Sequence, residues 1–400
     1  MQKKPTVLII AQDMPSPLDR RVWLEAKSLS TNSYEVIILC PKSNLFPKIF
    51  EVIDNIKIYR YPQIIEGKNP ISIFIEYVFS FLFLFFYQIY ISFNYQIQII
   101  QYCNPPDFLP LTSLGIRAFR NYKTVFDQHD VSPELWLAKG YSRKSIIYRI
   151  LLFLESYSLK HCDHIIFASE SFRDKALLNG TVTASKCTLI KTAPSRTFGD
   201  SVEQTSFKNN SHTRFIGYVG RMGSQDGLHI LIEAFAFLVH EFEYKDIGLK
   251  LIGDGPQRKE LEKLAKRLQV YELIFFLGYL SDEIDLCSEL KSCELAVCPD
   301  LPTEMNHMAS MNKITEYMAL NLPIVQFNLK QNVMTAGKFS YVVLEANALQ
   351  LAKGIQFILD DEKLAKSLAE GAKARFVNSL CWETQETKLI QVYNSIYALF

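Results

Sequence analysis

Residues 311–325 read MNKITEYMALNLPIV, and this stretch decides the fold. Apolar residues recur at helical spacing from Met311 to Met318, which predicts a short amphipathic helix. Pro323 ends that helix, and the apolar residues that follow it predict a buried strand. One carboxylate, Glu316, lies on the helix. A helix running directly into a buried strand is typical of an α/β protein with a parallel sheet.

Glu316 allows two interpretations. A lone acid close to a helix N-terminus, at the carboxyl edge of a parallel sheet, is well placed to bind a ribose hydroxyl while the helix end faces a phosphate. The alternative is that Glu316 only stabilises the helix dipole. This segment alone favours neither interpretation, so the rest of the chain has to decide between them.

Three glycine-containing turns precede this helix in the chain. The segments are 215–227 (FIGYVGRMGSQDG), 249–256 (LKLIGDGP) and 275–279 (FFLGY), and each begins as an apolar strand. Glycine has no Cβ, so such turns let a ligand approach the backbone closely. Helical patterns follow the first two turns, which places helix N–H groups at the same sheet edge. Together the turns and the Glu316 helix predict a phosphate-binding edge.

This ordered set of motifs resembles the C-terminal half of family 4 retaining glycosyltransferases of the GT-B fold. In the N-terminal half, 17–23 (PLDRRVW), 103–107 (CNPPD) and 125–135 (VFDQHDVSPEL) resemble a bacterial surface-polysaccharide branch of that family. The resemblance covers nearly the whole chain. It implies two Rossmann-like doubly wound domains with a cleft between them, and a nucleotide-sugar donor bound by the second.

The resemblance also assigns roles to individual residues. His129, Arg221 and Lys313 are the candidate catalytic groups, with Arg221 the best suited to a diphosphate because of its planar donor fork. Lys313 has an equally plausible alternative as part of a solvated helix face. The candidate donor-binding residues are Gly220, Gly253, Gly255, Tyr279, Ser310, Asn312 and Glu316. The candidate acceptor-binding residues are Arg20, Arg21, Asn104, Asp107, Asp130 and Glu134.

Arg20 and Arg21 also have two interpretations. They stand at the start of a predicted helix, where they could bind the phosphate of an acceptor such as a lipid diphosphate. They could equally pair with Asp19 and Glu25.

The chain departs from the family pattern at two positions of its second half, and residues 15–21 replace the family's usual double-glycine loop after the first strand. The family lysine five residues after the arginine is replaced by Asp226, which cannot hold a diphosphate. The first of the two family glutamates, separated from the second by seven intervening residues, would fall on Met308 when the second is Glu316. Binding of the diphosphate then rests on Arg221, Lys313 or backbone N–H groups, and recognition of the sugar stays open.

Length and charge agree with a two-domain enzyme. The chain has 400 residues, more than one ordinary core, and a net charge of +1, which argues against a general nucleic-acid binder. Eight scattered cysteines without a CxxC pair indicate reduced thiols in a cytosolic protein. We expect no metal site, and no secretory signal before the first strand. The expected domains are 1–195, a linker over 196–213, 214–380, and a helix over 381–400 that packs back on the first domain.

One stretch departs from an ordinary soluble protein. Between Ile71 and Ile116 there is no Lys or Arg, and 77–93 (YVFSFLFLFFYQIYISF) is almost wholly apolar. A spanning helix would split the first sheet, and a buried core helix would not need apolar residues on all sides. We therefore expect the apolar helix, over 71–93, to lie in a membrane interface or to face a membrane partner.

The sequence thus predicts a retaining, metal-independent, hexosyl- or N-acetylhexosaminyl-type glycosyltransferase. It would use a UDP- or GDP-linked sugar, without other cofactor, and a lipid-linked or oligosaccharide acceptor in the synthesis of exopolysaccharide, O-antigen or capsule. We expect it at the cytoplasmic face of the membrane, bound peripherally. Two alternatives remain: a nucleotide-sugar epimerase of the same two-domain plan, and a transferase-like protein that binds without catalysing.

Overall fold

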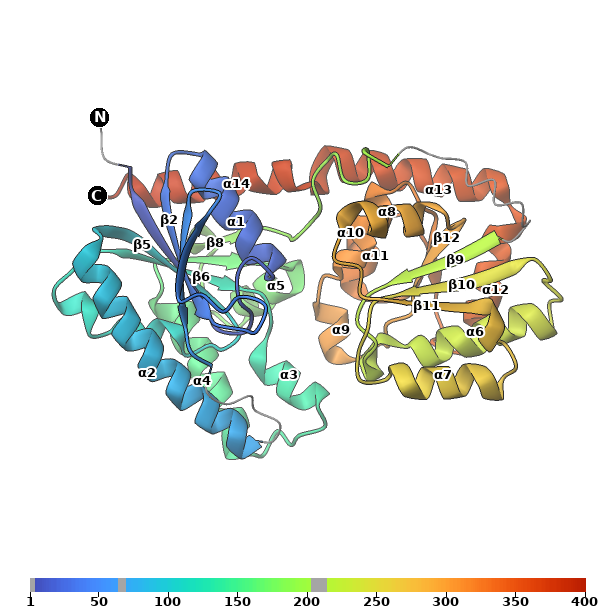
Figure 1. Ribbon diagram of the computed structural model, residues 1–400, viewed down its shortest axis with the longest axis horizontal. Coiled ribbons are helices and arrows are strands. Elements are labelled where there is room, and N and C mark those ends of the chain that lie inside the picture. The colour runs from blue at the N-terminus through green and yellow to red at the C-terminus, as the bar shows by residue number, and fades with distance from the viewer. Residues whose placement is uncertain (1–3, 64–69, 203–213) are drawn as a thin grey trace. The chain divides into compact units, whose positions relative to one another are not determined.

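The computed structural model describes residues 4–63, 70–202 and 214–400 (Figure 1). The chain divides into two compact units: the first comprises 1–191 and 385–400, and the second comprises 192–384. The boundary therefore falls a few residues before the expected one. The expected linker over 196–213 lies outside the described residues from 203 onward, and its described part belongs to the second unit.

The first unit is built on an eight-stranded sheet in the order β3-β4-β2-β1-β5-β6-β7-β8. All neighbouring pairs are parallel except β3 and β4, which form an antiparallel edge. The central strand β1 (TVLIIA) is buried at every position, as expected for a parallel strand covered on both faces. The strands are β1 Thr6–Ala11, β2 Glu35–Pro41, β3 Phe50–Ile53, β4 Ile56–Tyr61, β5 Ile97–Cys103, β6 Lys123–Gln128, β7 His164–Phe167 and β8 Cys187–Leu189.

Helices connect these strands and cover the sheet. The helix α1 begins after Asp19, whose carboxylate accepts hydrogen bonds from the backbone N–H groups of Arg21 and Val22. The long α2 carries the apolar stretch. The helices are α1 Arg20–Thr31, α2 Pro70–Asn94, α3 Ser132–Ala138, α4 Ile146–His161 and α5 Glu170–Leu178, with short 3₁₀ turns η1 Leu109–Ser113, η2 Ile116–Ala118 and η3 Ala184–Lys186.

The C-terminal helix α14 (Trp382–Tyr397) belongs to the first unit from Gln385 onward. The ring of Tyr393 on α14 packs edge-on against that of Tyr34, with ring centroids 5.9 Å apart. The hydroxyl of Tyr34 donates to Asn394 at 2.8 Å, and the hydroxyl of Tyr393 donates to Gln101 on β5. Helix α14 thus contributes to the core of the first unit.

The second unit has a six-stranded parallel sheet in the order β11-β10-β9-β12-β13-β14. The strands are β9 Arg214–Val219, β10 Ile247–Ile252, β11 Ile274–Gly278, β12 Leu295–Cys298, β13 Ile324–Phe327 and β14 Tyr341–Val343. The helices are α6 Leu228–His240, α7 Arg258–Arg267, α8 Glu283–Lys291, α9 Glu304–Met308, α10 Asn312–Ala319, α11 Lys330–Ala336, α12 Ala348–Asp360 and α13 Glu362–Arg375, with short turns η4 Ser224–Asp226, η5 Tyr271–Leu273 and η6 Phe376–Leu380.

The turns after β9 and β10 lie directly against each other. A Cβ on Gly253 would stand 1.9 Å from the carbonyl oxygen of Gly220, and one on Gly255 would stand 2.7 Å from that of Met222. Backbone hydrogen bonds join the same turns, from Gly220 N to the carbonyl of Ile252 and from Met222 N to that of Asp254, both at 3.0 Å. The glycines are therefore required by this backbone contact, whatever ligand the edge binds.

Gly253→Ala tests that contact. The new Cβ meets backbone at a positive φ of +124°, so we expect a loss of at least about 3 kcal/mol of unfolding free energy. Gly180→Ala is the matched control, because Gly180 also has a positive φ (+63°) but nothing within 4 Å of the new Cβ. The control should lose only about 1 kcal/mol. Urea unfolding of both variants measures the difference, and equal losses would contradict the packing described above.

Candidate functional site

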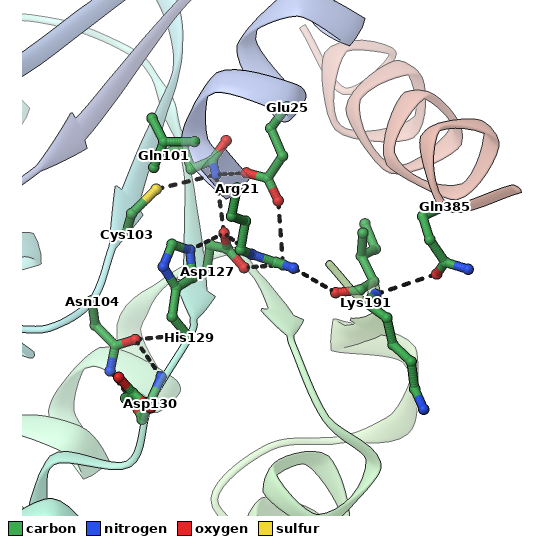
Figure 2. A network of polar contacts seen from close by, with 12 residues as sticks. Arg21, Glu25, Gln101, Cys103, Asn104, Asp127, His129, Asp130, Lys191 and Gln385 are labelled. Atoms are coloured by element: carbon green, nitrogen blue, oxygen red, sulfur yellow. Dashed lines mark hydrogen bonds and ion pairs between the residues drawn. The ribbon is translucent and has the colours of Figure 1, made fainter. Parts of the chain in front are cut away.

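His129 lies just past the carboxyl end of β6, in a polar network at that edge of the first sheet (Figure 2). Its Nε2 is 2.6 Å from a carboxylate oxygen of Asp127. The Asp127 side chain is wholly buried, whereas the His129 side chain is 16% exposed. Burial would lower the pKa of His129, but the Asp127 carboxylate outweighs burial and raises it. The Asp127 carboxylate thus favours the protonated form of a ring that solvent or a ligand can still reach.

Asp127 is held in turn by Arg21 from α1. The guanidinium donates to both carboxylate oxygens, at 3.0 Å from Nε and 2.6 Å from Nη2. Burial would raise the pKa of Asp127, but the charges of Arg21 and His129 outweigh it and lower that pKa below its usual value. Asp127 is therefore a carboxylate at neutral pH, and it fixes the His129 ring in one orientation.

Arg21 is buried and faces inward, which favours the paired alternative over binding of an acceptor phosphate. Besides Asp127, it contacts Glu25 at 3.2 Å and donates to the carbonyl of Ile190 at 2.8 Å. The next residue, Lys191, donates its backbone N–H to Gln385 on α14. This joins α1, β6, the end of β8 and α14 in one network (Figure 2).

Glu25 completes the buried cluster. Its carboxyl accepts a hydrogen bond from Gln101 at 2.5 Å. Burial, and then the charge of Asp127, raise the pKa of Glu25 to about 8. Two carboxyl groups thus share one network with Arg21 and His129, and of the two carboxyls it is Glu25 that holds a proton at neutral pH.

The remaining candidate acceptor-binding residues are Asn104, Asp107, Glu134, Arg20 and Asp130. Asn104 organises the loop: its Oδ1 accepts from the backbone N–H of His129 at 2.6 Å and of Asp130 at 3.3 Å, and its Nδ2 donates to Asp107 at 2.7 Å. Asp107 is buried beneath it, with a pKa raised by burial to about 6. Glu134 pairs with Lys175 at 2.5 Å. Arg20 and Asp130 lie partly exposed at the same edge.

A cation would find little room in this network. Cys103, Asp127 and His129 form the one group of potential metal ligands among residues 4–63, 70–202 and 214–400. Both Asp127 oxygens are already occupied by Arg21, and burial raises the pKa of the Cys103 thiol well above its usual value. A neutral thiol and a carboxylate paired with arginine are poor ligands.

The second unit places Arg221 at the tip of the turn after β9, exposed to solvent. The loop behind it is closed by Asp226, whose carboxylate accepts from the backbone N–H of Gly223 at 2.8 Å. The residue that replaces the family lysine therefore has a structural partner of its own. A lysine at this position could not accept that hydrogen bond.

Lys313 is buried in α10, so the interpretation as a solvated helix face is wrong. Its ammonium lies 2.8 Å from one oxygen of Asp300 and 3.1 Å from the other, and it also donates to the hydroxyl of Tyr218 at 3.2 Å. Burial would lower the pKa of Lys313, but Asp300 outweighs it and raises that pKa. Lys313 is a cation, but one that is paired within the protein. Nothing in the residues around 313 predicts that pair with Asp300.

The other donor-side residues surround the start of α10. Ser310 precedes the helix, Asn312 is its exposed first residue, and Glu316 is buried one turn later. Tyr279 follows β11 and is largely exposed. The second unit thus brings Arg221, two close-packed glycine turns and the Glu316 helix to the carboxyl ends of one parallel sheet.

The fold is the GT-B fold, as solved structures show over almost the whole chain. Sucrose-phosphate synthase from Thermosynechococcus elongatus superposes with a TM-score of 0.77 at 16% identity, covering 99% of this chain and 100% of that one. The Anabaena protein HepE in complex with UDP-glucose superposes with a TM-score of 0.71 at 15% identity, covering 98% and 99%. The expected fold class is confirmed.

The sequence of the second unit points to one class of enzyme within that fold. Residues 213–361 match the family model described as glycosyl transferases group 1. The alpha-D-kanosaminyltransferase of Streptomyces kanamyceticus is 29% identical over 157 residues, 39% of each chain. The capsular polysaccharide biosynthesis glycosyltransferase CapM of Staphylococcus aureus is 23% identical over 264 residues, 61% of this chain and 66% of that one.

The name of a third relative gives both the sugar that it transfers and its acceptor. The N-acetylgalactosamine-N,N'-diacetylbacillosaminyl-diphospho-undecaprenol 4-alpha-N-acetylgalactosaminyltransferase of Campylobacter jejuni is 22% identical over 279 residues, 68% of this chain and 70% of that one. The first two relatives are matched over only 39% and 66% of their own lengths. These similarities support a glycosyltransferase and leave donor and acceptor open.

Glu25→Gln tests the proton held in the buried cluster. Glu25 binds its proton more tightly in the folded protein, so the unfolding free energy falls as the pH rises from the ordinary pKa of 4.5 to about 8. Glutamine does not titrate, so the variant should lose this fall, which amounts to at most about 1.4 kcal/mol per pH unit. The raised pKa of His129 causes a fall of the same sign, which should remain. Urea unfolding between pH 5 and 8 measures both slopes, and equal slopes would show that Glu25 is ionised in the folded state.

Proposed function

We propose that the protein is a retaining glycosyltransferase that moves a hexosyl or N-acetylhexosaminyl group from a UDP- or GDP-sugar, without a metal. Its acceptor would be lipid-linked or an oligosaccharide, in the assembly of a bacterial surface polysaccharide at the cytoplasmic face of the membrane. The observation that carries the proposal is the edge of the second sheet, where Arg221, the glycine turns and the Glu316 helix meet.

That edge offers what a departing nucleoside diphosphate needs. Negative charge develops on the diphosphate as the glycosidic bond breaks, and positioned cations and backbone N–H groups stabilise it. Arg221 supplies a planar fork of N–H donors, and the close-packed turns expose backbone without side chains in the way. Glu316 would bind the ribose hydroxyls, as the family resemblance implies. Lys313, paired with Asp300, would act through its position under the turn and not as a free cation.

The relatives support the choice of substrates. UDP-glucose is bound in a protein of the same fold, and one relative is named for an acceptor on diphospho-undecaprenol. Another relative is named for capsular polysaccharide synthesis. For His129, the family resemblance implies a hydrogen bond to the transferred sugar. The Asp127 carboxylate raises the pKa of the ring and holds it in one orientation for such a bond.

A second candidate, a transferase-like protein that binds without catalysing, is favoured by three specific observations. Asp226 replaces the family lysine and closes its own loop, Met308 replaces a family glutamate, and the charge of Lys313 is matched by Asp300. This leaves Arg221 to carry the diphosphate charge. Binding and turnover therefore have to be measured separately.

Calorimetric titration with UDP, GDP and ADP, in the presence of a chelator, tests the donor site. We expect one nucleotide to bind, and Glu316→Ala to weaken it by about tenfold to a hundredfold, the effect of losing a hydrogen bond to a charged group. Glu272→Ala is the control, because Glu272 is exposed and lies away from α10. Unchanged affinity in Glu316→Ala would remove Glu316 from the donor site. Failure of the folded protein to bind any nucleotide would reject the transferase.

Arg221→Ala tests the stabilisation of the leaving group. Because the negative charge is greatest in the transition state, we expect kcat to fall by about a hundredfold to a thousandfold, with a much smaller change in nucleotide affinity. Lys259→Ala is the control, since Lys259 is an exposed cation on the neighbouring α7. Initial rates of sugar transfer, measured at saturating donor, give the comparison. Retained turnover in Arg221→Ala would exclude this residue from the mechanism.

A further inference from the structure

Helix α2 is more apolar on its outer side than a helix on the surface of a soluble protein. Its buried side contains the polar residues Ser80, Gln88 and Ser92 at helical spacing, together with Leu84 and Ile91. Its outer side contains large apolar rings, with Phe86 62% exposed and Phe93 76% exposed. A helix on an aqueous surface places its apolar side against the core and its polar side in water. The outer side of α2 is therefore made for an apolar surrounding.

Hydrogen bonds hold the polar side of α2 against the first unit. Gln88 donates to the hydroxyl of Thr112 at 2.5 Å and accepts from Ser113, both in η1. Near the other end of the helix, Gln12 donates to Glu76 at 3.2 Å and to Ser80 at 3.4 Å. These bonds fix which side of α2 faces outward.

The whole length of α2 lies along the first unit, so it does not cross a membrane as a separate helix. By length and composition alone, Ser72–Asn94 could span a bilayer. However, its rings pack on the unit at successive turns: Tyr77 on Phe108, Phe83 on Tyr61 and Tyr90 on Tyr59. The strands on either side, β4 and β5, also belong to one sheet. A position of α2 in the membrane interface is compatible with these ring contacts and with the pairing of β4 and β5 in one sheet.

A second helix, α4, extends the apolar surface. Ile146, Ile150 and Phe153 recur on one side of α4 and are 74%, 50% and 64% exposed. The turns η1 and η2 lie between the two helices, with Leu114 and Phe119 exposed. The turn η1 contacts α2 through the hydrogen bonds of Gln88. The loop before η1 contacts α4 through a 2.6 Å hydrogen bond from Ser158 to the carbonyl of Asp107.

The topology places these elements on one face of the sheet. The connections from β4 to β5, β5 to β6 and β6 to β7 all advance in the same direction, whereas α1 connects β1 back to β2. Because such crossovers are right-handed, α2, η1–η2 and α4 lie on the face opposite α1 (Figure 1). We call the exposed side chains of α2, η1–η2 and α4 the apolar face.

Positive charge surrounds the α4 end of the apolar face. Exposed basic residues precede and follow the apolar positions of α4, whereas between Leu135 and Lys160 the sole acidic residue, Glu155, is buried. The exposed basic residues there are Lys139, Arg143, Lys144, Arg149 and Lys160, and Arg117 and Arg120 flank Phe119. Arg117 also pairs with the exposed Asp163 at 3.8 Å. Exposed aromatic and aliphatic side chains beside basic ones that outnumber the exposed acids are complementary to an anionic lipid surface.

We propose that the apolar face docks on an anionic bilayer surface, with its rings in the interface and its basic side chains on lipid head groups. The inference rests on the proposed function in one respect: a lipid-linked acceptor would be reached from such a surface. A second copy of this chain fits the face less well, because a two-fold contact would bring the same basic residues together.

Vesicle co-sedimentation of the full-length protein tests the proposal. We expect binding to vesicles of phosphatidylcholine with about a third phosphatidylglycerol, weaker binding to phosphatidylcholine alone, and loss of the difference at high salt. Lys144→Glu with Arg149→Glu should weaken binding at least tenfold, since each basic residue contributes roughly fivefold. The charge control is Lys259→Glu with Lys353→Glu, two exposed lysines of the second unit. Equal binding to both vesicles would overturn the anionic-lipid assignment.

Serine substitutions test the apolar side chains of the apolar face. Phe86→Ser with Phe93→Ser, and separately Ile146→Ser with Phe153→Ser, should each reduce binding at least tenfold without lowering the melting temperature, because these side chains are exposed. Leu178→Ser with Leu344→Ser is the control, as both residues are highly exposed elsewhere. Loss of vesicle binding in the Phe86→Ser, Phe93→Ser variant alone would exclude α4 from the apolar face. Dimerisation that these variants abolish, without vesicle binding, would identify a self-association surface instead.

Two further measurements separate this inference from the function. Alkaline carbonate should release the protein from membranes of an expression host, and retention would show a spanning helix. Glu316→Ala should still bind vesicles, and the apolar-face variants should still bind nucleotide. Vesicle binding without nucleotide binding would reject the donor site alone, and nucleotide binding without vesicle binding would reject the docking face alone.

Discussion

The pairing of Arg21 with Asp127 is the constraint on which the first unit depends. A buried arginine and a buried aspartate are each costly unless they are paired and hydrogen-bonded, and here one bidentate contact satisfies both. The same guanidinium reaches Glu25 and the carbonyl of Ile190, so that α1, β6 and the end of β8 have a single compatible arrangement. The position of His129 is a consequence of that arrangement.

In the second unit, the equivalent constraint is a contact between backbones. The turns after β9 and β10 touch through Gly220 and Gly253, with no space for a Cβ between them. Arg221 projects from one of these turns, while Lys313 and Asp300 form their buried pair beneath. The chain thus has a rigid edge at this end of the sheet, although Asp226 and Met308 differ from the residues that members of the resembled family use there.

The apolar face shows how one helix can meet opposite demands on its two sides. Gln88 and Ser80 of α2 need hydrogen-bond partners when buried, and η1 and Gln12 provide them. The rings on the outside need a surrounding that water does not offer. The exposed apolar side of α2 therefore points to a surrounding beyond the protein itself.

The sequence by itself determined the α/β class, the positions of the glycine turns and the Glu316 helix, because strand, turn and helix signals are local. Only the tertiary structure decided that Arg21 pairs with Asp127, 106 residues away, that Lys313 pairs with Asp300, and which side of α2 faces outward. The antiparallel edge strand β3 was also not predicted, because its partly exposed residues give no apolar run. Ion pairs and helix orientation depend on which elements the fold brings together, and no spacing along the chain encodes that.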